Sequence, residues 1–267
     1  MPRILLDTHV HLYPAHDFAR TFDAFRRRAA RAGAGLGAMF LVERAGQDEF
    51  ARLAAGGAAL PRGVVAARRE NAALLLRGDR GGPPVAIVAG RQIACAERVE
   101  ILALGTRETF PDGIAAAEAV ERARRADALP VLAWGVGKWL GARARVVDAL
   151  LRRFPAEELP LGDTSLRPSF WPTPGPMAVA ATLGRRVLHG SDPLPPAFEQ
   201  TRAGQWADLA DEPFDLSGPL LGPLMAVLRE APLAPAGRRA GPVQFLRRML
   251  ASRKRAPVQR AAAPADA

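Results

Sequence analysis

The residues best suited to chemistry stand close together near the N-terminus, in the segment DTHVH at positions 7–11. They end an apolar stretch, residues 3–12, that predicts a buried β-strand. Alternate residues of a strand share a face, so we expect Asp7, His9 and His11 to point the same way. Neutral imidazole is the usual protein ligand of zinc, and two imidazoles on one face can hold one ion. Asp7 can support them by accepting a hydrogen bond from a ring N–H, which fixes the tautomer.

A second polar group follows the last predicted strand, residues 186–189, in the segment GSDP at positions 190–193. A short Gly-Ser-Asp turn is suited to exposing a carboxylate, here that of Asp192. The alternative is an ordinary turn or helix-capping aspartate. Two of the chain's four histidines share one strand end, which favours a metal site over accidental packing.

The elements that must position these residues alternate between strand and helix for most of the chain, which is typical of a parallel sheet. Predicted strands cover residues 3–12, 36–42, 99–104, 130–134, 159–161 and 186–189. Predicted helices cover residues 17–32, 47–55, 113–126, 142–154 and 177–183, with another possible at 220–228. Residues 64–104 contain several strands with little helix, which indicates an antiparallel excursion. The total of seven or eight strands favours an α/β, TIM-like barrel, in regular or distorted form, over an open sheet.

Together, the Asp-x-His-x-His motif at the end of the first strand and Asp192 after the last resemble the amidohydrolase superfamily and the related PHP phosphoesterases. The motifs lie at the two ends of a region of roughly 190 residues, the size of a barrel. The resemblance implies that His9 and His11 bind a divalent metal. It also implies that Asp192 binds metal and takes a proton from the attacking water.

The chain departs from both families in having no histidine between His16 and His189, where they place further ligands. Three protein ligands plus water would still make a catalytic site for one zinc ion. Three other residues follow predicted strands and are candidates to complete the site, although residues in such positions are more often structural. They are Glu108 and Asp163, as metal ligands, and Lys138.

Lys138 is one of only two lysines, the other being Lys254, in a chain that otherwise uses arginine. The resemblance suggests that it could imitate the carbamylated lysine that bridges metals in some amidohydrolases. It could instead bind an anionic substrate group as a point charge. Arg167 is a further candidate, either as a clamp for a carboxylate or phosphate or as a surface arginine.

The composition indicates a cytoplasmic globular protein. The 267 residues include a single cysteine, Cys95, which rules out an internal disulfide. No apolar run approaches the length of a membrane span, and we find no signal peptide. The net charge is +10, but residues 238–267 alone carry eight basic residues against Asp266, a net +7, which leaves +3 for the rest. We therefore expect one barrel domain, residues 1–237, and a basic, disordered tail, residues 238–267.

These observations predict a metal-dependent hydrolase that acts on an ester, amide or phosphoester through a metal-activated water. Zinc is the expected metal, with manganese or iron as alternatives, and the expected partner is a small-molecule substrate. Nucleic acid would be bound only through the tail, no membrane partner is expected, and the oligomeric state is open. Two alternatives remain: a catalytically degenerate barrel that acts as a binding or accessory protein, and a decarboxylase or lyase of the amidohydrolase type.

Overall fold

The computed structural model describes residues 3–79 and 81–253. The strands are β1 (Arg3–Val10), β2 (Ala34–Glu43), β3 (Val64–Arg69), β4 (Ala73–Gly78), β5 (Val85–Ala94), β6 (Glu100–Leu104), β7 (Leu129–Ala133), β8 (Leu161–Thr164), β9 (Val187–Gly190), β10 (Trp206–Ala210) and β11 (Leu233–Gly237). The α-helices are α1 (Phe18–Arg31), α2 (Glu49–Ala55), α3 (Ala116–Arg125), α4 (Ala142–Arg153), α5 (Gly175–Ala178), α6 (Leu221–Glu230) and α7 (Pro242–Arg253).

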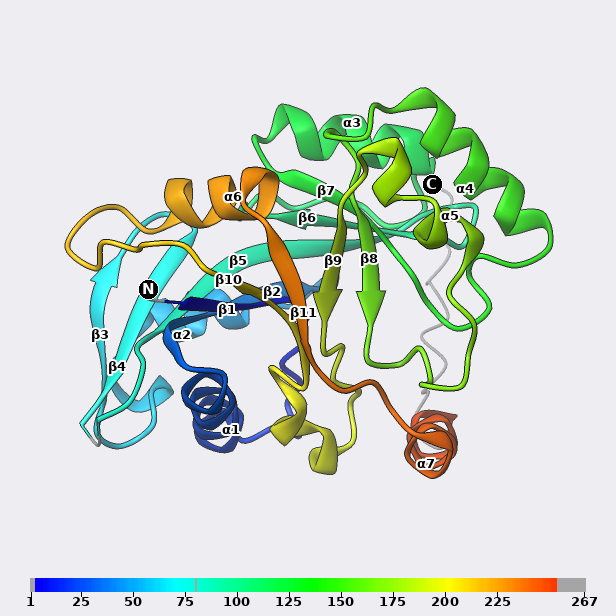
Figure 1. Ribbon diagram of the computed structural model, residues 1–267. Helices are drawn as coiled ribbons and strands as arrows, with labels where there is room; N and C mark the ends of the chain where they lie inside the picture. The colour runs from blue at the N-terminus through cyan, green and yellow to red at the C-terminus, as the bar shows by residue number, and fades with distance from the viewer. Residues whose placement is uncertain (1–2, 80, 254–267) are drawn as a thin grey trace, which may run out of the picture.

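The strands form one mixed sheet that curls into a nearly closed barrel (Figure 1). Along its main path the order is β11-β10-β1-β2-β5-β6-β7-β8-β9, while β3 and β4 form a hairpin beside β5. Strands β1, β2 and β5 are mutually parallel, and so are β7, β8 and β9. Strand β6 runs antiparallel to both of its neighbours, and β10 and β11 continue the sheet antiparallel beyond β1.

The barrel closes where β9 approaches β1 without pairing with it in the sheet. The hydroxyl of Thr8 donates to the carbonyl of His189 at 2.9 Å, and the amide of Asp192 donates to the carbonyl of His9 at 2.8 Å. A Cβ added to Gly190 would lie 2.3 Å from the Cβ of His9. Only glycine therefore lets the two strands come this close.

The core is divided by the wall of the barrel. Inward-facing residues of β1, β2, β5, β6 and β7 form one cluster, and the apolar face of α6 joins it. Helix α1 packs against the outside of β1, β2 and β5, while α3 and α4 cover the far side of the barrel.

Helix α1 illustrates how the sequence specifies an element. Asp17 caps its N-terminus by accepting a hydrogen bond from the amide of Ala19 at 2.9 Å. Phe22 and Phe25 follow at helical spacing and are fully buried, which contributes about 2–3 kcal/mol each. Phe25 packs onto Gly37 of β2, where a Cβ would lie only 2.5 Å from the ring.

The predicted α/β barrel is confirmed in its coarse form, with helices around a curled sheet. The strand count and directions differ from the expectation, because the main path has nine strands and the antiparallel β6 interrupts the alternation of a TIM barrel. None of the described helices has the length and hydrophobicity needed to cross a membrane.

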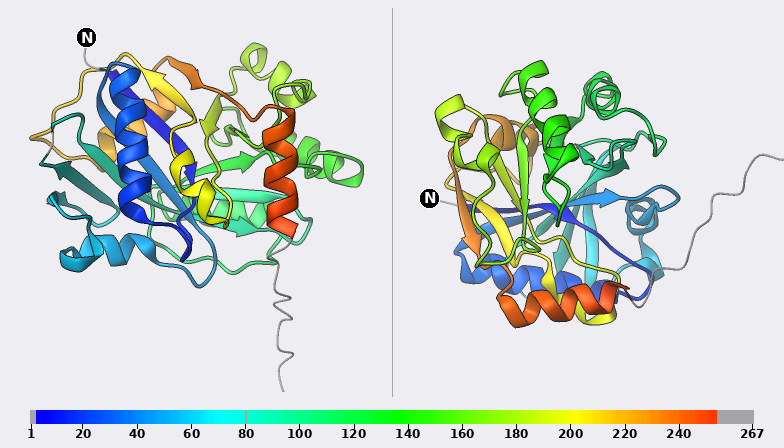
Figure 2. Two further views of the ribbon diagram at one scale, coloured as in Figure 1. Left: turned by 90° about the horizontal axis from the view of Figure 1, so that it is seen from below. Right: turned by 90° about the vertical axis from the view of Figure 1, so that its right-hand side faces the viewer.

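The C-terminal segment also differs from the expectation of disorder from residue 238. Residues 242–253 form α7, which lies against the barrel (Figure 2). Arg248 of this helix is fully buried and forms an ion pair with Glu199. The basic segment that was predicted to be solvated thus contains one buried arginine, Arg248. Residues 254–267 lie outside the described part of the chain, and for them disorder stays a prediction.

Candidate metal centre

A bulge in β1 sets the direction of both candidate histidines. Asp7 pairs with Met39 of β2 and Val10 pairs with Leu41, so three steps along β1 match two along β2. The extra residue reverses the alternation of side chains. His9 and His11 consequently face the cleft in the barrel interior, while Asp7 faces outward. The expectation that all three share one face is wrong for Asp7.

Asp7 instead ties β1 to both ends of the segment that joins β9 to β10. Its fully buried carboxylate accepts hydrogen bonds from the backbone amides of Ser191, Gly204 and His9, at 2.9, 2.6 and 3.2 Å. Burial raises the pKa of this carboxyl to about 7, although the hydrogen bonds oppose the shift. Asp7 therefore holds the backbone that carries the candidate ligands. The predicted hydrogen bond from an imidazole ring to Asp7 is not formed, because its carboxylate is bonded to backbone amides instead.

Three potential ligand atoms converge at the mouth of the barrel. The Nε2 atoms of His9 and His11 lie 3.1 Å apart, and Oδ1 of Asp192 lies 3.6 and 3.7 Å from them. These separations are close to the edge of a tetrahedron with zinc–ligand bonds of 2.0–2.1 Å, about 3.3 Å. The structure thus brings together a histidine pair and an aspartate that are more than 180 positions apart in the chain.

The protonation of the two histidines suits metal binding. Burial lowers the pKa of His9 to about 4 and that of His11 to about 3, so both rings are neutral at pH 7. Their Nδ1 atoms are buried and have no hydrogen-bond partner among the described residues. Burial also raises the pKa of Asp192, against the opposing influence of His11 and Arg248. The donor set therefore fits one divalent cation.

The loop geometry that presents Asp192 is unusual for a residue other than glycine. Its φ is +45°, in the left-handed region that aspartate tolerates better than most residues. The preceding Ser191 is held by Asp7, and the amide of Asp192 itself is held by His9. This strained turn aims the carboxylate back over the end of β1.

The candidate ligands lie in a cleft of about 820 Å³ that also contains charged residues. Lys138, in the loop after β7, lines the cleft and forms an ion pair with Glu100, the first residue of β6. The nearby lysine helps to lower the pKa of Glu100, against the effect of burial. Arg44 and Tyr13 also line the cleft. Lys138 is thus in the cleft as predicted, paired with a carboxylate that sequence analysis missed.

Glu108 is not in this cleft. It is exposed, in the segment after β6, where its neighbour Arg107 stacks on Phe50 outside the barrel. The prediction assumed that β6 is parallel to the other strands. Because β6 is antiparallel, its first residue, Glu100, enters the cleft instead. The available signal was the pattern Glu100-x-Leu102-x-Leu104, a charged residue that continues an apolar strand face.

Asp163 also fails to reach the site. It lies on β8 in register with His189 and is fully occupied by Arg167, which donates Nε and Nη2 to its two oxygens at 2.7 and 2.6 Å. The pair is buried. Asp163 is therefore paired with a buried arginine and lies apart from the three converging ligand atoms, and Arg167 is not on the surface.

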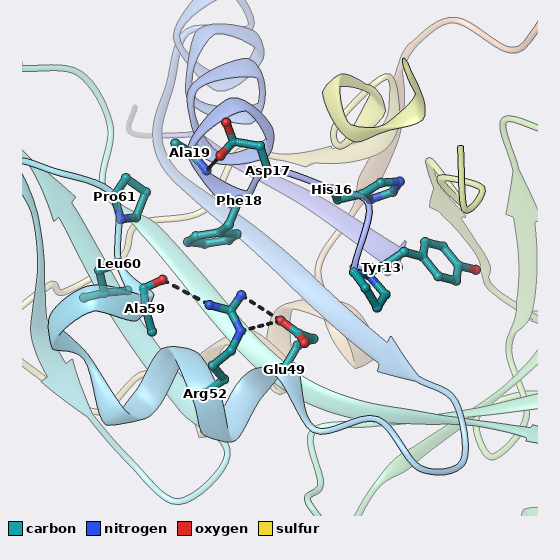
Figure 3. A pocket seen from close by; sticks show the side chains of 11 residues that line it. Tyr13, His16, Asp17, Phe18, Ala19, Glu49, Arg52, Ala59, Leu60 and Pro61 are labelled. Atoms are coloured by element: carbon teal, nitrogen blue, oxygen red, sulfur yellow. Dashed lines mark hydrogen bonds and ion pairs between the residues drawn. The ribbon is translucent and has the colours of Figure 1, made fainter. Parts of the chain in front are cut away.

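The remaining histidines lie outside the site. His189 bonds through Nδ1 to the buried Asp208 at 2.6 Å. His16 lines a separate pocket of about 440 Å³, where Arg52 bonds to Glu49 and to the carbonyl of Ala59 (Figure 3). Tyr13 lines both this pocket and the cleft.

Comparison with known proteins gives a likeness of fold alone. No protein-family model matches the chain, and no curated protein matches it. PsfC from Pseudomonas syringae PB-5123 superposes with a TM-score of 0.56 at 17% identity, covering 95% of this chain and 99% of PsfC. The lesion-specific endonuclease PfuEndoQ from Pyrococcus furiosus superposes with a TM-score of 0.52 at 14% identity. That match covers 88% of this chain but 59% of the endonuclease.

Proposed function

We propose that this protein is a metal-dependent hydrolase with a single divalent ion held by His9, His11 and Asp192. The observation that carries the proposal is the convergence of two neutral imidazoles and one carboxylate in a large cleft. The fold likeness to an endonuclease and the resemblance of the motifs to PHP enzymes support the same class. Zinc suits a set of two nitrogens and one oxygen best, with manganese or iron as alternatives.

The chemistry that such an ion supplies is Lewis acidity and a water molecule acidified toward neutral pH. The chain's own residues would perform the other tasks. The carboxylate of Asp192 would accept the proton of the attacking water, because it is the acidic group beside both imidazoles. Lys138 would stabilise negative charge on the substrate across the cleft.

The substrate is inferred from the charges in the cleft. Lys138 and Arg44 are cationic, Glu100 and Asp192 are carboxylates, and a bound divalent ion would make the sum of these charges positive. This balance favours a phosphoester over a neutral ester or amide, because a phosphoryl group brings its own negative charge. The likeness to a lesion-specific endonuclease adds the phosphodiesters of damaged DNA to the substrates to be tested.

The proposal is tested by metal analysis of protein purified without chelator. We expect about one equivalent of zinc, manganese or iron per chain, lost in His9→Ala and retained in His16→Gln, the matched control outside the site. Chains that hold less than about a tenth of an equivalent, even after soaking in metal, would contradict it. Hydrolysis assays then identify the type of bond that is cleaved. The substrates are aryl phosphomonoesters, phosphodiesters, esters, amides and damaged duplex DNA.

A binding or accessory protein is the second candidate. It is favoured by the Glu100–Lys138 pair, which occupies the cleft with a salt bridge instead of additional metal ligands. Metal bound at one equivalent without turnover of any of these substrates would favour this function over hydrolysis.

A further inference from the structure

The C-terminal helix α7 reaches the candidate metal centre through two neighbouring side chains: Met249 lines the cleft, and Arg248 contacts the loop that carries Asp192. Arg248 is fully buried, although it belongs to a helix whose neighbouring residues Leu246, Arg247 and Leu250 are exposed. Burying a guanidinium is costly unless its N–H groups are bonded and its charge is paired. The partners of Arg248 therefore indicate what the helix is built to hold.

Those partners converge on the loop that carries Asp192. Arg248 donates Nη2 to the main-chain carbonyl of Asp192 at 2.9 Å and Nη1 to the hydroxyl of Ser165 at 3.0 Å. Its Nε and Nη2 pair with Oε2 of Glu199 at 2.9 and 2.7 Å. The hydroxyl of Ser165 in turn donates to the carbonyl of Ser191. Arg248 thus holds one carbonyl of the loop directly and the preceding one through Ser165.

We infer that Arg248 is a positioning residue for the metal site, fixing the left-handed turn that directs the Asp192 carboxylate toward His9 and His11. The inference rests on the proposed function. The turn is held on one side by Asp7 and by the carbonyl of His9, and on the other side by Arg248. Release of either side allows the φ of +45° at Asp192 to relax, which would move the carboxylate.

The geometry requires arginine rather than any cation. A guanidinium presents its donors in a rigid planar fork and can satisfy Glu199, Ser165 and the Asp192 carbonyl at once. A lysine keeps the charge beside Glu199 but cannot reproduce this fork. Arg248→Lys should therefore retain much of the ion pairing in the core while releasing the turn at Asp192.

The test is the metal affinity of full-length Arg248→Lys, measured by titration of the metal-free protein with Zn²⁺. We expect affinity to fall by about 10–100-fold, the usual effect of losing a group that orients a ligand. The matched control is Arg247→Lys on the same helix, where the arginine stacks on Phe198; its affinity should not change.

The outcomes separate this inference from the proposed function. Wild-type protein that binds no metal would overturn the proposed function and this inference with it. Wild-type binding together with unchanged affinity in Arg248→Lys would overturn the positioning role alone. If Arg248→Lys does not fold, Ser165→Ala, which removes the hydroxyl bonded to Arg248 and to the Ser191 carbonyl, provides the second measurement. Unchanged affinity there would count against the role.

Discussion

At the scale of single residues, the candidate site combines two neutral imidazoles and a carboxylate with a fixed positive charge. His9 and His11 are uncharged because burial disfavours their protonated forms. The positive charge comes from Lys138, which neutralises Glu100 in the same cleft. A buried carboxylate and a divalent cation attract each other strongly in such surroundings. Lys138 therefore competes with any second ion for Glu100.

Removal of this lysine should change the number of metal ions bound. In Lys138→Met the carboxylate of Glu100 loses its counter-charge, so we expect a second equivalent of Mn²⁺ to bind at millimolar metal, measured by elemental analysis after equilibrium dialysis. The double variant Glu100→Gln/Lys138→Met is the control and should bind one equivalent. A stoichiometry of one in the single variant would show that Glu100 is not available to a metal.

Residue type and spacing selected His9 and His11, and the resemblance of the motifs to known families added Asp192; the structure brings the three together. They were not enough for Glu100, because the direction of β6 depends on its partners in the sheet and not on its own residues. The same limit misplaced Glu108. Asp7 was assigned to the wrong face because the bulge in β1 leaves no mark in the local hydrophobic pattern.

At the scale of elements, the site depends on how closely β9 approaches β1. Gly190 makes the approach possible, because any side chain there meets the Cβ, backbone nitrogen and Cα of His9. These atoms of His9 are backbone atoms and a Cβ, so rotation of a side chain cannot move them out of the way. The strand pair is thus both the seam of the barrel and the support of two candidate ligands.

Gly190→Ala should accordingly weaken the fold and the site together. We expect a loss of about 1–3 kcal/mol or more in the free energy of unfolding by urea, because the added methyl overpacks the seam. Metal affinity should fall as well. Gly175→Ala is the matched control, since a Cβ there meets nothing within 4 Å. Equal stability of Gly190→Ala and wild type would contradict this account of the seam.

At the scale of the whole molecule, the described chain is a barrel with a C-terminal helix fastened to its mouth. The polar anchor is the fully buried Arg248–Glu199 pair, and Arg202 also pairs with Glu199 at 2.7 Å. Composition alone pointed to a tail beginning at residue 238, because arginine content does not distinguish a solvated charge from a buried one. The packing of α7 becomes evident only once Glu199 is placed opposite Arg248.

Two truncations should separate the contribution of α7 to stability from that of residues 254–267. Removal of residues 254–267 should leave the thermal unfolding temperature and metal content unchanged. Removal of residues 238–267 also deletes Arg248, and we expect a loss on the order of 3 kcal/mol because Glu199 keeps only one of its two arginines. Calorimetry of both truncated proteins measures this. Equal melting temperatures would show that α7 is dispensable.

The seam between β1 and β9 has a consequence for the order of assembly. His9 on the first strand and His11 just after it are two candidate ligands, and the third comes from a loop more than 180 residues later. Such distant contacts carry a high entropic cost and form late in folding. No partly formed sheet that lacks the seam can present all three donors. Metal capture during refolding would therefore mark the final closure of the barrel.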